Sequence, residues 1–200
     1  MKIAVDIDDT LNIARRLELG SAYIERKGLP FQVKDPYANK LVEVFDWTSE
    51  DALHFVREEG GAVIYTDAEA RKGAREALAG WRALGHKIVI LTARDKEWFG
   101  NPERVSRDWL EKRRIPYDEI VADVPLNDKG AYCLEHGIPV LIDDDPVACM
   151  NAQNRGIMSV LAIGRHNAAV APKIRYGGAN WKQIDAAVKH IFAVLQANRG

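Results

Sequence analysis

Short, unbroken apolar runs limit what this chain can fold into more than any other feature of its sequence. Four of them occupy residues 3–5, 88–91, 139–142 and 158–162, and a weaker one covers residues 119–122. A strand with one solvated face alternates between apolar and polar residues, so continuous runs of this length indicate strands that are buried on both faces. The runs therefore predict a parallel sheet covered by helices on both sides.

Helical patterns separate these runs. Asn101 is a good N-cap and Pro102 suits the first helical position, whereas Gly85 and Gly137 are suitable residues just after a helix end. We expect helices over residues 68–84, from 102 onward, over 129–135, from 146 to about 156, and over 181–197. Alternating strands and helices predict an α/β fold with an open, Rossmann-like parallel sheet.

The segment between the first two apolar runs is too long for an ordinary crossover connection. It extends from Thr10 to about Thr66, carries helical patterns and many aromatic residues, and is interrupted by Pro30 and Pro36. We expect residues 11–66 to form a small helical cap above the carboxyl edge of the sheet, with 1–10 and 67–200 as the core. The alternative is an elaborate connection that packs on the core.

The overall composition argues against several classes of protein. A formal net charge of -1 provides no global positive field for nucleic acid or an anionic membrane. No stretch approaches the roughly 18 apolar residues of a membrane span, and acidic residues follow the first apolar run too soon for a signal peptide. Cys133 and Cys149 match no metal-ligand or redox spacing. We expect a soluble cytoplasmic protein, either a monomer or a homodimer, that acts on a small molecule.

Acidic residues follow two of the predicted strands. Asp6, Asp8 and Asp9 come after the first run, and Asp143 and Asp144 follow the run that ends at residue 142. The sites of open α/β sheets lie at the carboxyl ends of the strands, so the two clusters can lie side by side. Their oxygens suit a hard cation such as Mg²⁺. Helix capping and a solvated loop before a helix are the simpler alternatives.

Complementary groups follow two further predicted elements. Thr92, Ala93 and Arg94 come after the second run and add a hydroxyl and a guanidinium, and Lys129 adds an ammonium at a helix N-terminus. Each residue alone would be a cap or a surface residue in most proteins. Their order along the chain, beside two acid clusters, is what indicates a common site.

With these groups in this order along the sequence, the chain resembles the haloacid dehalogenase superfamily of phosphohydrolases. Its four motifs correspond to residues 6–10, Thr92, Lys129 and Asp143 with Asp144. Softer similarities at residues 91–94, 142–146, 166–167 and 180–181 resemble a bacterial nucleotidase-like branch related to the cytosolic 5′(3′)-deoxyribonucleotidases. Asp145 departs from that branch, whose members tend to have arginine at the corresponding position.

The resemblance implies a Mg²⁺-dependent phosphatase. Asp6 would attack phosphorus and form an aspartyl phosphate, and Asp8, with a raised pKa, would move protons. The implied metal ligands are Asp6, the Asp8 carbonyl and an acid from Asp143 and Asp144. The implied phosphate-binding residues are Asp9, Thr92, Ala93 and Lys129.

The substrate is less defined than the chemistry. Phe45 and Trp47 could stack on a base, and Arg94 could contact the substrate. Alternatively, both aromatic residues pack inside the cap and Arg94 forms a structural ion pair. The leading hypothesis is a 5′-nucleotidase for (deoxy)nucleoside monophosphates. The alternatives are a phosphatase for another small metabolite such as a sugar phosphate, a phosphatase for nucleic-acid ends, and a non-catalytic protein that binds a phosphorylated ligand.

Overall fold

The computed structural model describes residues 1–58 and 65–197, and within them the central element is a six-stranded parallel sheet. The strand order is β5-β4-β1-β6-β7-β8. The strands are β1 (Lys2–Val5), β4 (Lys87–Leu91), β5 (Glu119–Val121), β6 (Val140–Asp143), β7 (Met158–Ala162) and β8 (Tyr176–Gly178). The predicted α/β fold with a parallel sheet is confirmed, and β8 is an edge strand that the apolar pattern did not reveal.

Helices cover both faces of the sheet. On one face, α4 (Ala74–Ala83), α6 (Pro102–Lys112) and α9 (Trp181–Ala197) pack with strand residues such as Ile3 and Val5. On the other face, α7 (Lys129–Glu135) and α8 (Pro146–Gln153) pack against intervening strand residues such as Ala4. Because successive strand side chains point to opposite faces, each continuous apolar run serves both cores. Among the described residues, no helix combines the length and hydropathy that crossing a bilayer requires.

Helix α4 begins later than expected. The predicted helix from residue 68 is wrong at its start, because Glu69–Ala70 form a short strand, β3, that pairs antiparallel with β2 (Asn12–Ile13). Gly73 precedes the helix with a φ of 90°, which side chains other than glycine rarely adopt. The β2–β3 pair therefore takes residues that helical spacing alone would assign to α4.

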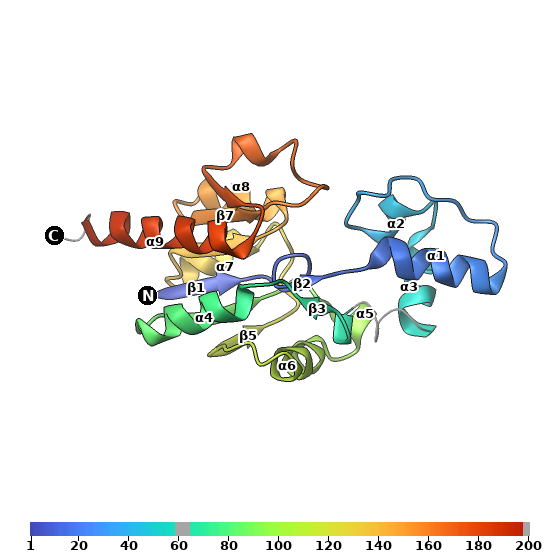
Figure 1. Cartoon of the computed structure of the whole chain (residues 1–200), viewed down its shortest axis with the longest axis horizontal. Coiled ribbons are helices and arrows are strands. Elements are labelled where there is room, and N and C mark those ends of the chain that lie inside the picture. The colour runs from blue at the N-terminus through green and yellow to red at the C-terminus, as the bar shows by residue number, and fades with distance from the viewer. Residues whose placement is uncertain (59–64, 198–200) are drawn as a thin grey trace.

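Between β2 and β3 lies a group of helices with its own apolar core. They are α1 (Arg16–Lys27), α2 (Leu41–Val44) and α3 (Ser49–Phe55), and they stand beside the sheet in Figure 1. Thr48 and Asp51 form a reciprocal capping box at the start of α3. Residues 59–64 of the expected cap and 198–200 of the expected core lie outside the described residues.

Candidate active site

Three acidic side chains meet where β1 and β6 end. The two strands are parallel neighbours with Val5 opposite Ile142, so Asp6 emerges beside the residues that follow β6. Each of Asp6, Asp143 and Asp144 offers a carboxylate oxygen that lies within 4.8 Å of the others, and all three side chains are buried. Sheet topology thus brings together acids that are more than 130 positions apart in the chain.

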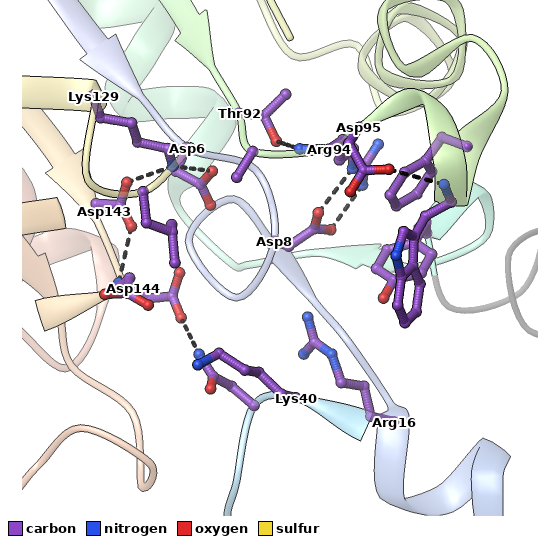
Figure 2. A pocket seen from close by; sticks show the side chains of 17 residues that line it. Asp6, Asp8, Arg16, Lys40, Thr92, Arg94, Asp95, Lys129, Asp143 and Asp144 are labelled. Carbon is purple, nitrogen blue, oxygen red and sulfur yellow. Dashed lines mark hydrogen bonds and ion pairs between the residues drawn. The ribbon is translucent and has the colours of Figure 1, made fainter. Parts of the chain in front are cut away.

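Lys129 links two of these acids. Its ammonium donates to Oδ1 of Asp6 at 2.8 Å and to Oδ2 of Asp143 at 2.7 Å, and the side chain is fully buried (Figure 2). Burial lowers the pKa of Lys129, but Asp143 and Asp6 outweigh that effect and raise it above its ordinary value. The ammonium therefore stays charged and provides a fixed cation inside the site.

One lysine does not balance three buried carboxylates. Burial raises the pKa of Asp6, and Asp143 and Asp8 add to that rise, while Lys129 opposes it. Burial also raises the pKa of Asp143 and the pKa of Asp144. This cluster of hard oxygen donors, with an excess of negative charge, fits a divalent cation such as Mg²⁺. Asp6, Asp143 and Asp144 are the residues that would hold it.

The side chain of Asp144 is supported by groups from three distant segments. Thr10 Oγ1 donates to its Oδ1 at 3.3 Å, while Asn39 Nδ2 at 3.3 Å and His166 Nε2 at 3.0 Å contact its Oδ2. Asn167 Nδ2 donates to its backbone carbonyl at 2.6 Å. Sequence reasoning did not assign Asn39 to the site, because a single asparagine in a loop carries no signal of a contact 105 residues away.

Asp8 lies in a different environment from Asp6. Arg94 donates to both of its carboxylate oxygens, and in Figure 2 Asp8 points toward Arg94 while Asp6 faces Lys129. Burial raises the pKa of Asp8, but Arg94, Arg16 and a hydrogen bond from Asn12 outweigh burial, so the pKa of Asp8 is lowered. The expectation of a raised pKa at Asp8 is wrong, because a buried guanidinium favours the charged form.

A cavity of about 200 Å³ opens above the acids. Thr92 and Ala93 line it at the end of β4, together with Asp6 and Lys129, and the Thr92 hydroxyl accepts a hydrogen bond from the Arg94 amide at 3.3 Å. Asp8 and Arg94 also line it. The structure therefore groups the predicted catalytic residues around one cavity, whose outer wall is formed by Arg16, Asn39, Lys40, Tyr65, Asp95, Trp98 and Phe99.

Asp9 is turned away from this cavity. It has a φ of 58°, its carboxylate accepts from the Ala14 amide at 3.2 Å and pairs with Arg16, and its own amide donates to Asn12 Oδ1 at 2.8 Å. Asp9 instead lines a neighbouring cavity of about 440 Å³ with Tyr37. These contacts show that Asp9 stabilises the loop that carries Asp6 and Asp8. They do not bring it to the predicted phosphate site.

The two aromatic residues expected to stack on a substrate lie elsewhere. Phe45 and Trp47 are buried among the helices between β2 and β3, with ring centroids 4.5 Å apart and nearly parallel planes. They line neither of these two cavities, so the geometry corresponds to the alternative in which they pack the cap. Tyr65, Trp98 and Phe99 line the cavity instead. Trp98 and Phe99 follow Arg94 by a few residues in the chain. That proximity to a predicted site residue is the sequence signal that could have assigned them to the cavity.

Similar folds occur among solved structures, although no protein-family model and no curated protein matches the sequence. A haloacid dehalogenase-like family hydrolase from Streptococcus pneumoniae has a TM-score of 0.67 and 15% identity, with 92% of this chain and 96% of that chain covered. A HAD family hydrolase from Deinococcus radiodurans R1, solved with bound phosphate and sodium, has a TM-score of 0.68 and 15% identity, with coverage of 94% and 95%.

A third similar structure is described as a predicted phosphoglycolate phosphatase from Haemophilus somnus 129PT. It has a TM-score of 0.64 and 15% identity, and the match covers 91% of this chain and 95% of that chain. Identities this low establish shared architecture. The chain therefore has the fold of haloacid dehalogenase-superfamily hydrolases.

Proposed function

We propose that this protein is a Mg²⁺-dependent phosphoric monoester hydrolase whose nucleophile is Asp6. The observation that carries the proposal is the buried Asp6–Lys129–Asp143 array beside Asp144 and Thr92, at one cavity. A phosphate monoester is a dianion, so a carboxylate can approach phosphorus only where cations offset the repulsion. A divalent cation at the acid cluster would supply further positive charge to the phosphoryl oxygens.

The proposed reaction has two steps. In the first, an Asp6 oxygen forms a bond to phosphorus, the ester P–O bond breaks, and the leaving oxygen keeps the electron pair and takes a proton from Asp8. Because Arg94 favours the charged form of Asp8 in the substrate-free protein, Asp8 would first have to take up that proton from solvent. In the second, water attacks the aspartyl phosphate, Asp8 takes a proton from that water, and Asp6 and inorganic phosphate are released. Lys129 and Thr92 would stabilise the phosphoryl group in both steps.

The leaving group would be recognised where the proposed cap, residues 11–66, faces the core. Tyr65, Trp98 and Phe99 offer apolar and aromatic surface, and Arg16 and Lys40 line the same cavity. This combination supports a (deoxy)nucleoside monophosphate as substrate. A smaller phosphometabolite is the second candidate, because about 200 Å³ is below the roughly 300–1,000 Å³ of most ligand pockets.

A phosphatase screen over nucleotides and small phosphometabolites tests the proposal. Wild-type protein with Mg²⁺ should hydrolyse at least one of them, and excess chelator should abolish the activity. Asp6→Asn should reduce kcat by more than about 1,000-fold, and Asp8→Asn should reduce it by roughly 100- to 10,000-fold. Asp108→Asn is the matched control, because Asp108 is an exposed acid on α6.

The outcomes separate the alternatives. Full activity in Asp6→Asn would refute the mechanism. Phosphate binding without hydrolysis of any ester would favour a non-catalytic protein for phosphorylated ligands. A preference for nucleotides over sugar phosphates would establish the nucleotidase activity, and the reverse preference would leave only the phosphatase chemistry.

A further inference from the structure

The three acids of the candidate cation site are not all held by the same part of the chain. Lys129 Nζ donates to Asp6 Oδ1 at 2.8 Å and to Asp143 Oδ2 at 2.7 Å (Figure 2). The Asp145 amide donates to Asp143 Oδ1 at 2.9 Å. These donors come from α7 and from the turn between β6 and α8, and both helices pack on the sheet. The sheet and its covering helices therefore orient the carboxylates of Asp6 and Asp143.

Asp144 also receives a donor from the segment between β2 and β3. Asn39 Nδ2 donates to Oδ2 of Asp144 at 3.3 Å, across 105 positions of the sequence. The remaining contacts come from the part of the chain that carries the sheet: Thr10 Oγ1 donates to Oδ1 at 3.3 Å, and His166 Nε2 lies 3.0 Å from Oδ2. Among the described residues, Asn39 is thus the one donor that the segment between β2 and β3 gives to the acid cluster.

The fold of that segment sets the position of Asn39. Asn39 lies two positions before α2, whose Leu41 and Val44 are buried in the apolar cluster of the segment. Its side chain is partly buried and lines both the cavity above the acids and the neighbouring cavity. The packing of α2 therefore places this amide where the segment faces the acids.

The donors on Asp144 bear on how its carboxylate would bind a cation. A carboxylate has about four lone-pair positions. Asn39 and His166 contact Oδ2, whereas Thr10 alone contacts Oδ1, so Oδ1 keeps a position with no donor among the residues that the structure describes. Mg²⁺ demands near-ideal octahedral geometry, which makes its affinity sensitive to the orientation of each ligand. Hydrogen bonds to a ligating carboxylate fix that orientation.

We propose that Asn39 is a positioning residue that holds the Asp144 carboxylate in the orientation in which it binds Mg²⁺. The inference rests on the proposed function, which takes the acid cluster as a Mg²⁺ site. Asn39 acts through Asp144, because its amide nitrogen donates to the carboxylate and has no lone pair to offer a metal. The segment between β2 and β3 then contributes to cation binding as well as to the wall of the cavity.

Isothermal titration calorimetry with MgCl₂ alone tests this role. Asn39→Ala should raise the Kd for Mg²⁺ by roughly 10-fold, the usual cost of removing a hydrogen-bond partner of a metal ligand. In phosphatase assays, the Mg²⁺ concentration that gives half of the maximal rate should rise by a similar factor. Saturating Mg²⁺ should restore most of kcat, which it could not do for a variant whose fold is damaged.

Two further variants separate the hydrogen bond from damage to the loop. Asn39→Gln keeps an amide donor, so it should retain more affinity for Mg²⁺ than Asn39→Ala does. Tyr37→Ala is the matched control in the same loop, because the exposed Tyr37 ring lies 5.2 Å from the guanidinium carbon of Arg165 and does not contact Asp144. Its Kd for Mg²⁺ should equal that of the wild type.

An unchanged Kd in Asn39→Ala, or equal losses in Asn39→Ala and Tyr37→Ala, would overturn the inference and leave the proposed phosphatase activity standing. A wild type that hydrolyses no ester would refute the proposed function instead. Calorimetry requires no turnover, so it still measures the effect of Asn39 on Mg²⁺ binding in that case. The two failures therefore give different results.

Discussion

Gly130 controls how closely helix α7 approaches helix α8, and replacing it with alanine tests that packing. A Cβ built at residue 130 would lie 2.8 Å from the backbone nitrogen of Ala152 and 2.9 Å from its Cα. Both atoms belong to the backbone of α8, so they cannot turn aside as a flexible side chain could. Gly130→Ala must therefore push one helix away from the other.

The expected cost follows from overpacking. Inserting a methyl group into a well-packed interior costs about 1–3 kcal/mol, and a change of this size corresponds to a decrease in Tm of roughly 2–4 °C per kcal/mol in a chain of this length. Gly130 adjoins Lys129, whose ammonium bonds to Asp6 and Asp143. The displacement should therefore also reduce activity, because these contacts depend on where α7 begins.

Urea unfolding of Gly130→Ala and Gly80→Ala measures the effect. Gly80 lies on an exposed part of helix α4 with nothing within 4 Å of its Cβ position. Gly80→Ala should be neutral or stabilising by about 0.5–1 kcal/mol, because alanine is the better helix former. If Gly130→Ala unfolds at the same urea concentration as the wild type, the steric reasoning is refuted.

Two further predictions concern burial and pH. Phe45→Ala should destabilise the protein by about 3–5 kcal/mol while leaving KM unchanged, measured by urea unfolding and steady-state kinetics; an altered KM at wild-type stability would instead place Phe45 at the substrate. Burial raises the pKa of Asp118, but bonds from the Ile88 amide and Arg82 outweigh burial and lower it. Because the folded-state pKa lies below the unfolded value, this stabilisation is present above about pH 4 and is lost as the pH falls through the folded-state pKa. Asp118→Asn should therefore be less stable than wild type at pH 7 by an amount that shrinks in acid; a constant difference in urea unfolding between pH 7 and pH 3 would contradict it.

Local patterns were sufficient for most of the fold. Continuous apolar runs identified five of the six sheet strands, because burial on both faces leaves no polar alternation. Asn101 and Pro102 marked the start of α6, since capping depends on residues within one turn. β8 and β3 were missed because Tyr176–Gly178 and Glu69–Ala70 are too short and too weakly apolar to stand out from a loop.

The candidate site divides in the same way. The sequence by itself predicted that Asp6, Thr92, Lys129 and Asp143 follow strands or begin a helix at one edge of a parallel sheet, because alternating strands and helices imply parallel strands whose carboxyl ends share an edge. It could not determine the environment of Asp8, since electrostatic effects act between groups close in space, whatever their separation along the chain. Only the tertiary structure paired Asp8 with Arg94, 86 residues away. This pairing lowers the pKa of Asp8, which its neighbouring acids had been expected to raise.

The aromatic residues illustrate the same limit. Phe45 and Trp47 belong to the apolar cluster of the segment between β2 and β3, whereas Trp98 and Phe99 line the cavity. Nothing in residue type distinguishes a ring that packs a core from a ring that lines a site, because both require a large apolar surface. The position of each segment in the fold decides the role: Phe45 and Trp47 lie between α2 and α3, whereas Trp98 and Phe99 lie beside the end of β4.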